Sequence, residues 1–517
     1  MTISEQKKRE LRKAAIIFAY VALFVISIAA MTSYFSTDLI RPIVTEFKEK
    51  MGYTTAQVNL LSSIYSLPPI IFLFFSGLIT DKIGIRKSSL MLMALIAGGS
   101  YLVTFMDYKM ILLGRLLIGL GAESFFVVMN KIITKWFKDK QLAMAFGLNL
   151  LLCRLGSIAA FNLLPWVVKS YSLNTALWVG AGLTILGFFL TILYCLIDKH
   201  GDEKGYVAVI DDSGEEPFKV RDALRLPAAF WVITLLCVTY YSTIFPFTGV
   251  SKDLFVEKEK KKLIVNLEKK GMPNPLTSKL FDLINDENTL KDEKKAENIA
   301  EELRKSNLCH SVAINFDAQH SLYNLELSYE SKGETVQKSI NREFLTGPEY
   351  TRLNQAKIDG ARLTSLILVI SMCVTWLFGL MIDKIGKRAT LMIIGSIIMI
   401  PCHVSLVYTN IPPIIPMIVL GLSFALVPAA LWPAVPLIVK ERNLGTAYGI
   451  IFMIQNIGLF LFEPLAGKLF DMTGNYKLSM IMFSALGVVG LGFAIWLKLL
   501  EKKGGGYLDT SKPKVLQ

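Results

Sequence analysis

The sequence Gly77-Leu-Ile-Thr-Asp81-Lys82-Ile-Gly84-Ile-Arg86-Lys87 returns later in the chain as Gly379-Leu-Met-Ile-Asp383-Lys384-Ile-Gly386-Lys387-Arg388. Each copy follows an apolar segment that is long enough to cross a membrane. A single G-x-x-x-D-K-x-G spacing would be a weak signal, but two copies at matching places indicate an internal repeat. The chain is therefore expected to contain two similar halves.

Twelve apolar segments, each about 20 residues long or longer, surround the two copies and have the length of membrane-spanning helices. In the first half they run approximately over 14–35, 55–80, 88–106, 109–135, 141–168 and 174–197. In the second half they run approximately over 229–250, 361–382, 389–408, 412–439, 445–469 and 477–499. We predict an all-α membrane protein with a six-helix bundle at 14–197, a linker at 198–228 and a second bundle at 229–250 and 361–499.

The composition favours the same class of protein. Hydrophobic residues make up 53% of the 517 residues, which is too apolar for a chain whose surface must be covered by charges. The net charge of +13 does not indicate a nucleic-acid binder, because the basic residues lie at the ends of apolar segments and form no continuous patch. A soluble enzyme is excluded on the same grounds.

Metal, cofactor and nucleotide chemistry find no support in the sequence. The six cysteines have no paired spacing, the four histidines form no HExxH, and no G-x-x-x-x-G-K-[ST] loop is present. The apolar run that begins at Ala14 continues to about Phe35, longer than the core of a signal peptide, and predicts an uncleaved first helix.

Lysine and arginine gather on one side of the predicted membrane: before the first segment, between the second and third, and between the fourth and fifth. By the positive-inside rule both termini are cytoplasmic, and 251–360 is an extracytoplasmic insertion between helices 7 and 8. Helical periodicity over 277–305 and strand-like alternation over 311–340 predict a small α+β domain. A solvated, partly disordered insertion is the alternative, because Lys and Glu dominate its first half.

Each residue type of the repeated motif has a physical role. Its first glycine allows neighbouring helices to approach, the aspartate can cap a helix or pair with a cation, and the basic residues can bind lipid headgroups. Ordinary turn residues would explain the cations but not the repeated spacing. The predicted gate residues are Gly77, Asp81, Lys82, Gly84, Arg86, Gly379, Asp383, Lys384, Gly386 and Arg388.

Charged side chains inside the spans are scarce, and each is a candidate functional residue because a charge in hydrocarbon is costly. Glu123 and Arg154 stand out, and Asn130 lies two helical turns after Glu123 on the same face. A guanidinium can hold a carboxylate and a carboxylate can hold an ammonium group, so the pair suits a zwitterion such as a small amino acid or peptide. In the alternative interpretation Glu123 and Arg154 only neutralise each other, or Glu123 pairs with Arg115.

Aromatic and amide side chains near helix interruptions complete the predicted lining of the site. For any single aromatic residue, packing against a neighbouring helix is the competing interpretation. The predicted lining residues are Tyr34, Tyr65, Tyr241, Trp432 and Gln455.

Several stretches together resemble one family: Gly121-Ala-Glu123-Ser124, Lys135-Trp136-Phe137-Lys138, Arg154-Leu-Gly156-Ser157, Ala430-Leu431-Trp432-Pro433 and Leu444-Gly445-Thr446-Ala447-Tyr448-Gly449. These are similar to the lysosomal dipeptide transporter family of the major facilitator superfamily and its bacterial relatives. The resemblance implies that Glu123 and Arg154 engage the charged ends of a dipeptide. It also implies passive transport without a nucleotide or cofactor, and a gate motif that latches the cytoplasmic side.

Two features depart from that family. The part of the insertion from about 259 to 360 has no counterpart in the animal members, and Glu463 places a carboxylate where the family is apolar. Glu463 and Glu123 are therefore candidates for proton coupling, although Glu463 could also lie near the outer interface and be hydrated. The animal proteins use a glycosylated accessory subunit, whereas this chain has no N-x-[ST] sequon, so a bacterial inner membrane is expected rather than a lysosomal-type membrane. An accessory subunit is not implied.

The sequence thus predicts a secondary transporter for dipeptides or similar small zwitterions that works by alternating access. The first alternative is a transporter of monocarboxylates or other organic anions, which would rely on Arg154. The second is a membrane sensor or scaffold whose insertion binds a partner. For a transporter the expected partners are a small-molecule substrate, either a dipeptide or a small carboxylate, and the lipid bilayer. Nucleic acid is not expected as a partner in any of these cases.

Overall fold

The computed structural model describes residues 5–137, 142–206, 226–284, 287–439, 444–504 and 508–509. These residues form two compact units. The first contains residues up to Val44, Thr54–Val250 and the chain from Ala361 onward, and the second contains Thr45–Tyr53 and Ser251–Gly360. We describe each unit by itself.

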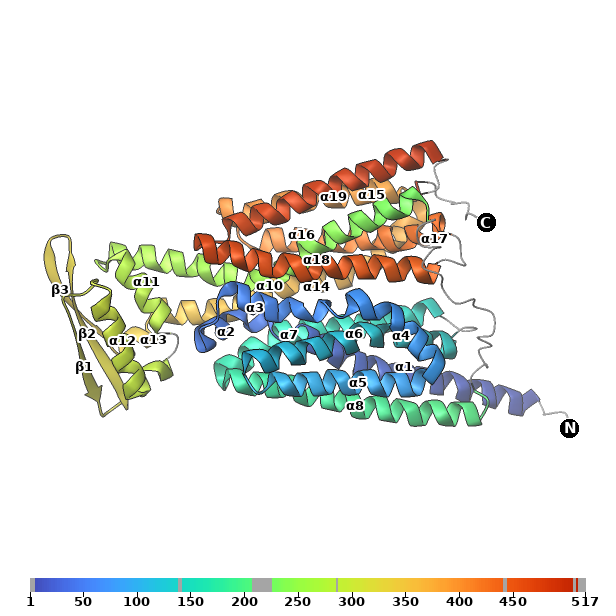
Figure 1. Cartoon of the computed structure of the whole chain (residues 1–517), viewed down its shortest axis with the longest axis horizontal. Helices are drawn as coiled ribbons and strands as arrows, with labels where there is room; N and C mark the ends of the chain where they lie inside the picture. The colour runs from blue at the N-terminus through green and yellow to red at the C-terminus, as the bar shows by residue number, and fades with distance from the viewer. Residues whose placement is uncertain are drawn as a thin grey trace. The chain divides into compact units, whose positions relative to one another are not determined.

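The first half of the membrane unit consists of long helices that run side by side (Figure 1). Its elements are α1 (Glu5–Thr37), η1 (Arg41–Ile43), α3 (Thr55–Ser63), η2 (Ile64–Ser66), α4 (Pro69–Ile83), α5 (Ile85–Val103), α6 (Tyr108–Phe137), α7 (Leu142–Ser170) and α8 (Leu173–Glu203). The predicted second span is interrupted at Pro68-Pro69, where α3 and η2 give way to α4, because proline cannot donate a helical hydrogen bond.

The second half repeats this arrangement. Its elements are α10 (Ala228–Lys269), α14 (Pro348–Ile385), α15 (Arg388–Tyr408), α16 (Ile414–Leu431), η4 (Trp432–Ala434), α17 (Val435–Ile438), α18 (Leu444–Thr473) and α19 (Lys477–Gly504). Proline interrupts the predicted span at 412–439 as well, because Pro433 lies in η4 and Pro436 in α17.

Among the described residues, 11 helices are long and apolar enough to cross a membrane. The predicted span at 88–106 is the one outside this set. It is present as α5, whose first turn contains Arg86 and Lys87 and which packs against α6 and α8. Large apolar side chains such as Ile71, Phe189 and Trp376 are more than half exposed, as expected for surfaces that face lipid. The predicted twelve-helix membrane fold is confirmed.

Glycine permits the closest helix contact in the first half. A Cβ atom placed on Gly119 of α6 would lie 1.8 Å from the carbonyl oxygen of Tyr65 in η2. No larger residue fits there without separating the two backbones, so Gly119 fixes how α6 packs against the interrupted second span.

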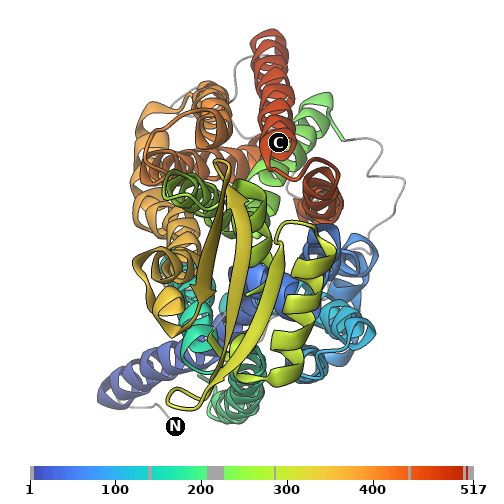
Figure 2. The same cartoon turned by 90° about the vertical axis from the view of Figure 1, so that its left-hand side faces the viewer.

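The second unit combines helices with one antiparallel sheet. Its elements are α2 (Val44–Met51), α11 (Asn274–Leu283), η3 (Glu287–Lys291), α12 (Glu293–Lys305), β1 (Ser311–Asp317), β2 (Leu322–Ser331), β3 (Glu334–Ile340) and α13 (Arg342–Thr346), together with the end of α10 and the start of α14. The three strands form one sheet in the order β1-β2-β3 (Figure 2). Leu325 of β2 pairs with Ile314 of β1 and with Ile340 of β3.

Local sequence explains these elements. The turn between β2 and β3 contains Lys332 and Gly333 at φ values of 54° and 85°, the left-handed conformation of a two-residue hairpin turn. In α12, Ala296, Ile299 and Leu303 are buried at helical spacing, and this helix packs against β1 and β2. The alternative of a solvated, disordered insertion is therefore wrong for the described residues, which share one hydrophobic core.

Candidate substrate-binding site

Glu123 lies near the middle of α6 and is half-buried. Asn130 follows two turns later on the same helix and is also half-buried, so both residues lie on one face of α6. Within the described part of the chain, Glu123 forms no ion pair. Such a carboxylate is available to a ligand that carries a positive charge.

Arg154 comes from the neighbouring helix α7 and is half-buried. Its guanidinium carbon lies 5.1 Å from the ring centroid of Phe424, a buried residue of α16. A cation over an aromatic ring is attracted by the electron density of the ring face. This contact joins the first half to the second.

Three of the predicted tyrosines lie around these charges. Tyr34 interacts electrostatically with both Glu123 and Arg154. The ring centroid of Tyr65 lies 4.8 Å from the guanidinium carbon of Arg115 on α6, the helix that carries Glu123. The ring of Tyr241 packs edge-on at 6.0 Å against Phe424, the ring that contacts Arg154. The structure thus brings the two charges and the three tyrosines into one region.

The second half contributes an aromatic cluster to this region. The indole N–H of Trp432 donates a hydrogen bond of 2.9 Å to the hydroxyl of Tyr241. Trp432 stacks on Phe452 at 4.9 Å between ring centroids, and Tyr241 stacks on Phe245 at 5.8 Å. Gln455 is buried nearby and accepts a hydrogen bond from Cys237. These rings fix the shape of the wall that faces the first half.

The two neutralisation hypotheses are wrong for this structure. Glu123 and Arg154 form no ion pair with each other among the described residues. Arg115 is not the partner of Glu123, because its guanidinium donates to four backbone carbonyls at 2.7–3.0 Å. The acceptors are Ser36, Thr37, Leu61 and Ser62.

Glu463 is fully buried, so the hypothesis that it is simply hydrated is wrong. Its carboxylate accepts a hydrogen bond of 2.9 Å from Arg41, which also pairs with Asp38 at 2.8 Å. The backbone carbonyl of Glu463 accepts a bond from Asn59. Sequence analysis missed Arg41, because 422 residues separate the partners and no local pattern connects them.

A second contact joins the halves close by. Both carboxylate oxygens of Asp471 accept hydrogen bonds from the first backbone N–H groups of α3, at 3.0 Å from Thr55 and 2.8 Å from Ala56. A carboxylate is favourable there because a helix N-terminus has unpaired N–H groups and a positive dipole end. Glu463 and Asp471 therefore hold α18 of the second half against α3 and Arg41 of the first.

The first copy of the repeated motif forms an ion-pair network. Arg86, expected to bind lipid headgroups, pairs instead with Asp198 at 2.6 Å and with Asp202. Lys135 also binds both aspartates, and the indole of Trp136 donates to Asp198 at 3.0 Å. Sequence analysis missed Asp198 and Asp202. They lie four residues apart at the end of a span, on one face of the helix, and this spacing could have predicted an ion pair with a basic motif.

The glycines of the motif act through the backbone. Gly84 and Gly386 have φ values of 83° and 70°, a conformation that other residues rarely adopt. Gly379 does not serve close helix approach, since a Cβ placed there would meet no atom within 4 Å. Lys82 and Lys384 are exposed, and the backbone N–H of Arg388 donates to Leu508. The surroundings of Gly77 and the side chains of Asp81 and Asp383 lie outside the described residues.

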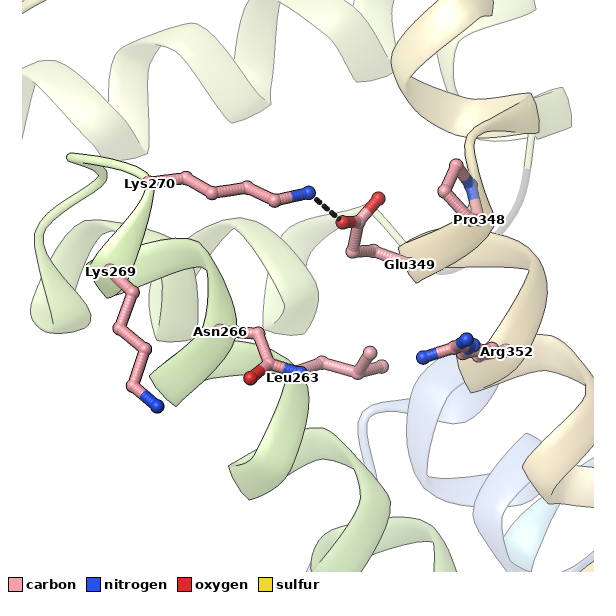
Figure 3. Close-up of a pocket in the computed structure, with 7 residues that line it drawn as sticks. All are labelled: Leu263, Asn266, Lys269, Lys270, Pro348, Glu349 and Arg352. Carbon is pink, nitrogen blue, oxygen red and sulfur yellow. Dashed lines mark hydrogen bonds and ion pairs between the residues drawn. The ribbon is translucent and has the colours of Figure 1, made fainter.

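No group of three or more metal-binding side chains occurs among the residues that the structure describes. A separate groove of about 450 Å³ lies in the second unit, where Lys270 and Glu349 face each other at 2.5 Å (Figure 3). Its lining includes none of the predicted site residues.

The family sequence model of the Major Facilitator Superfamily matches residues 26–255 and 354–514 of this chain. The match leaves out most of the insertion. The chain belongs to the Major Facilitator Superfamily. Its transporter fold is also seen in a crystal structure of a mutant of the nucleoside transporter NupG, with a TM-score of 0.61 and 12% identity over 92% of this chain and 99% of that one. At this identity the likeness shows the fold alone.

Curated relatives within the Major Facilitator Superfamily are transporters. The chain is 27% identical to the lysosomal dipeptide transporter MFSD1 of Homo sapiens over 93% of this chain and 85% of that protein. It is 27% identical to the same transporter of Bos taurus over 96% and 88%. A shorter match, at 24% identity over 37% of this chain and 47% of the relative, is to the probable sulfoacetate transporter SauU of Cupriavidus necator. The chain is accordingly a multi-pass membrane transporter of this superfamily.

Proposed function

We propose that the protein transports dipeptides or similar small zwitterions by alternating access. The observation that carries the proposal is the pair of opposite charges on the neighbouring helices α6 and α7: among the described residues, neither Glu123 nor Arg154 forms an ion pair, and Arg154 lies against the ring of Phe424. A carboxylate and a guanidinium left unpaired in a membrane span are costly unless a ligand neutralises them. The dipeptide transporters among the relatives support this substrate class.

The opposite charges of Arg154 and Glu123 determine which groups of a substrate the site can bind. Arg154 can form paired, charge-assisted hydrogen bonds with the terminal carboxylate of a dipeptide. Glu123 can accept hydrogen bonds from its terminal ammonium group, and Asn130 can bind a neighbouring polar atom. The aromatic wall around Tyr241 and Trp432 then surrounds the peptide side chains.

Alternating access requires the two halves to separate at each end in turn. The contacts of Arg41 with Glu463 and of Asp471 with α3 join the halves at one end, so they must break when that end opens. We call these two contacts the α18 latch. We assign Glu463 to this latch in preference to a role in proton coupling. Proton coupling through Glu463 or Glu123 is tested by comparing uptake with and without a pH gradient.

The charge pattern supports an orientation with both termini in the cytoplasm and the insertion outside, and the lack of N-x-[ST] sequons favours a bacterial inner membrane. In this orientation the network of Arg86, Lys135, Asp198 and Asp202 lies on the cytoplasmic side. Labelling of single cysteines from each side of the membrane tests the orientation. A lysosomal-type membrane would preserve the same relation to the cytoplasm.

An organic-anion transporter is the second candidate, because Arg154 alone is sufficient to hold a carboxylate or sulfonate and one relative is a probable sulfoacetate transporter. A sensor or scaffold would need neither the unpaired charges nor the α18 latch. These three functions make different predictions about ligands.

The deciding experiment is thermal unfolding of the purified full-length protein with alanyl-alanine, its C-terminal amide, its N-acetyl form, alanine, lactate and sulfoacetate. A ligand that binds only the folded state at 100 times its Kd adds about 2.7 kcal/mol of stability. We expect stabilisation by alanyl-alanine that weakens when either end is blocked. Stabilisation by lactate or sulfoacetate but not by dipeptide would favour the anion transporter, and no stabilisation at all would oppose both transport proposals.

A further inference from the structure

Phe424 is a residue of α16 that sequence analysis did not single out. It is 2% exposed, and the centroid of its ring lies 5.1 Å from the guanidinium carbon of Arg154. Its ring is itself held edge-on by Phe245, at 5.5 Å and 90°, and by Tyr241, at 6.0 Å and 80°. The hydrogen bond from Trp432 to Tyr241 fixes this group further.

An aromatic face attracts a cation without taking up all of its directed hydrogen-bond donors. A carboxylate partner at the same place would occupy the guanidinium and would compete with the substrate. Because Arg154 has no carboxylate partner among the described residues, the ring of Phe424 keeps it in place while its N–H groups remain available.

We infer that Phe424 is a positioning residue that aims Arg154 at the carboxylate of the substrate. The inference rests on the proposed function, since it assigns a role within the same site. It predicts that the loss of the ring impairs recognition of the carboxylate end specifically.

The test compares Phe424→Leu with Phe424→Tyr, measured as binding of alanyl-alanine and of its C-terminal amide. Phe424→Leu should weaken binding of the free dipeptide about 5- to 30-fold and binding of the amide less than about twofold, because only the free carboxylate uses Arg154. Phe424→Tyr keeps an aromatic face and should stay within about threefold of the natural protein. Equal losses for both ligands in Phe424→Leu would reduce Phe424 to a packing residue.

A second measurement does not depend on the substrate. Phenylglyoxal modifies accessible guanidinium groups, and mass spectrometry of peptides that contain Arg154 gives its reaction rate. Phe424→Leu should raise that rate severalfold and Phe424→Tyr should not. Unchanged reactivity in Phe424→Leu would overturn the inference, whereas a natural protein that binds no dipeptide would overturn only the proposed function.

A different observation concerns the second unit, in which α2 packs on α10 and α14. Three ion pairs join these helices: Glu46 with Lys252, Lys48 with Asp253 at 2.6 Å, and Glu49 with Lys357 at 2.6 Å. We call these six residues the α2 clamp. The side chains of Lys252 and Asp253 are at most 2% exposed.

The α2 clamp joins parts of the chain that belong to different halves. Helix α2 lies in the connection between the first and second spans, whereas α10 and α14 are helices of the second half. A buried ion pair that loses one partner leaves an uncompensated charge, so the pairs resist separation. A motion of one half against the other therefore has to open the α2 clamp or be restrained by it.

We propose that the α2 clamp restrains the motion of one half against the other during transport. This proposal rests on alternating access and gives a role to charged residues at the two ends of the insertion. Fastening the clamp covalently should stop the transport cycle.

Cross-linking tests the proposal in a background without the six natural cysteines. Glu49→Cys with Lys357→Cys, joined by a short bis-methanethiosulfonate reagent, should lower alanyl-alanine uptake at least tenfold, and a reductant should restore it. The matched control is Lys279→Cys with Glu302→Cys, which replaces an ion pair of 2.7 Å between α11 and α12 of the same unit. Cross-linking of the control pair should leave uptake within twofold. Full uptake by the cross-linked α2 pair would sink the proposal, and absence of uptake before cross-linking would instead count against the proposed function.

A conformational readout keeps the proposal testable without a known substrate. Ser365 of α14 is buried and accepts a hydrogen bond of 3.2 Å from Asn162 of α7, so it reports on the contact between the halves. With Ser365→Cys as the sole cysteine, replacing Glu46 and Glu49 by glutamine should raise the rate of maleimide labelling at least threefold. Glu302→Gln is the control, and equal labelling rates in all proteins would contradict the proposal.

Discussion

Arg154→Ala is expected to abolish stabilisation by alanyl-alanine while the protein still folds. The guanidinium is the cationic pole of the proposed site, and removing one partner of a desolvated, charge-assisted pair costs about 2–5 kcal/mol. That loss corresponds to roughly 30-fold to several-thousand-fold weaker binding. Thermal unfolding over a series of dipeptide concentrations measures it.

Glu123→Gln should give the complementary result. It keeps the size of the side chain but removes the negative charge, so binding of the free dipeptide should fall while binding of N-acetyl-alanyl-alanine stays within about twofold. Lys109→Ala, at an exposed position near the start of the same helix, is the control and should bind like the natural protein. Unchanged dipeptide binding in both Arg154→Ala and Glu123→Gln would contradict the zwitterion site.

Arg115→Met is expected to cause the largest loss of stability. Arg115 is fully buried and donates to the carbonyls of Ser36, Thr37, Leu61 and Ser62, which lie where α1 ends and within α3. Without it, four carbonyl groups in a buried, apolar region lose a donor, and each unsatisfied group costs about 1–3 kcal/mol before relaxation. We expect a net loss of about 3–5 kcal/mol, because relaxation recovers part of that cost.

Circular dichroism of the purified protein during thermal unfolding measures this effect. Arg115→Lys should recover only part of the stability, because lysine has three donors and lacks the planar fork of arginine. Lys109→Ala should unfold at the natural temperature. If Arg115→Met unfolded at the same temperature as the natural protein, the four carbonyls would have found other hydrogen-bond donors. Arg115 would then not be needed for stability.

Local patterns predicted the membrane spans correctly and singled out the charged residues within them, which stay candidates for the substrate site. A helix in lipid needs about 20 apolar residues in succession, so both its presence and its rare charges are visible along the chain. The strands within 311–340 were also visible, since alternating apolar and polar residues along one segment show which face of a sheet is buried.

Pairings between distant residues were not visible in the same way. Glu463 was noticed as an unusual carboxylate, but its partner Arg41 could not be found, because a side chain of either charge can be hydrated or paired depending on what packs beside it. Arg115 was taken as a candidate partner for Glu123, yet its donors satisfy backbone carbonyls that are exposed only where helices end or bend.

The sequence by itself therefore determined the membrane fold, its duplicated halves, the secondary structure of the insertion and the two charges proposed to bind substrate, because each depends on spacing along one segment. The tertiary structure alone decided which charges stay unpaired, that Phe424 faces Arg154, that α18 contacts α3, and that Thr45–Tyr53 packs with the insertion. These outcomes depend on side-chain packing between segments far apart in the chain, where burial and geometry, not residue type, set the energy of each contact.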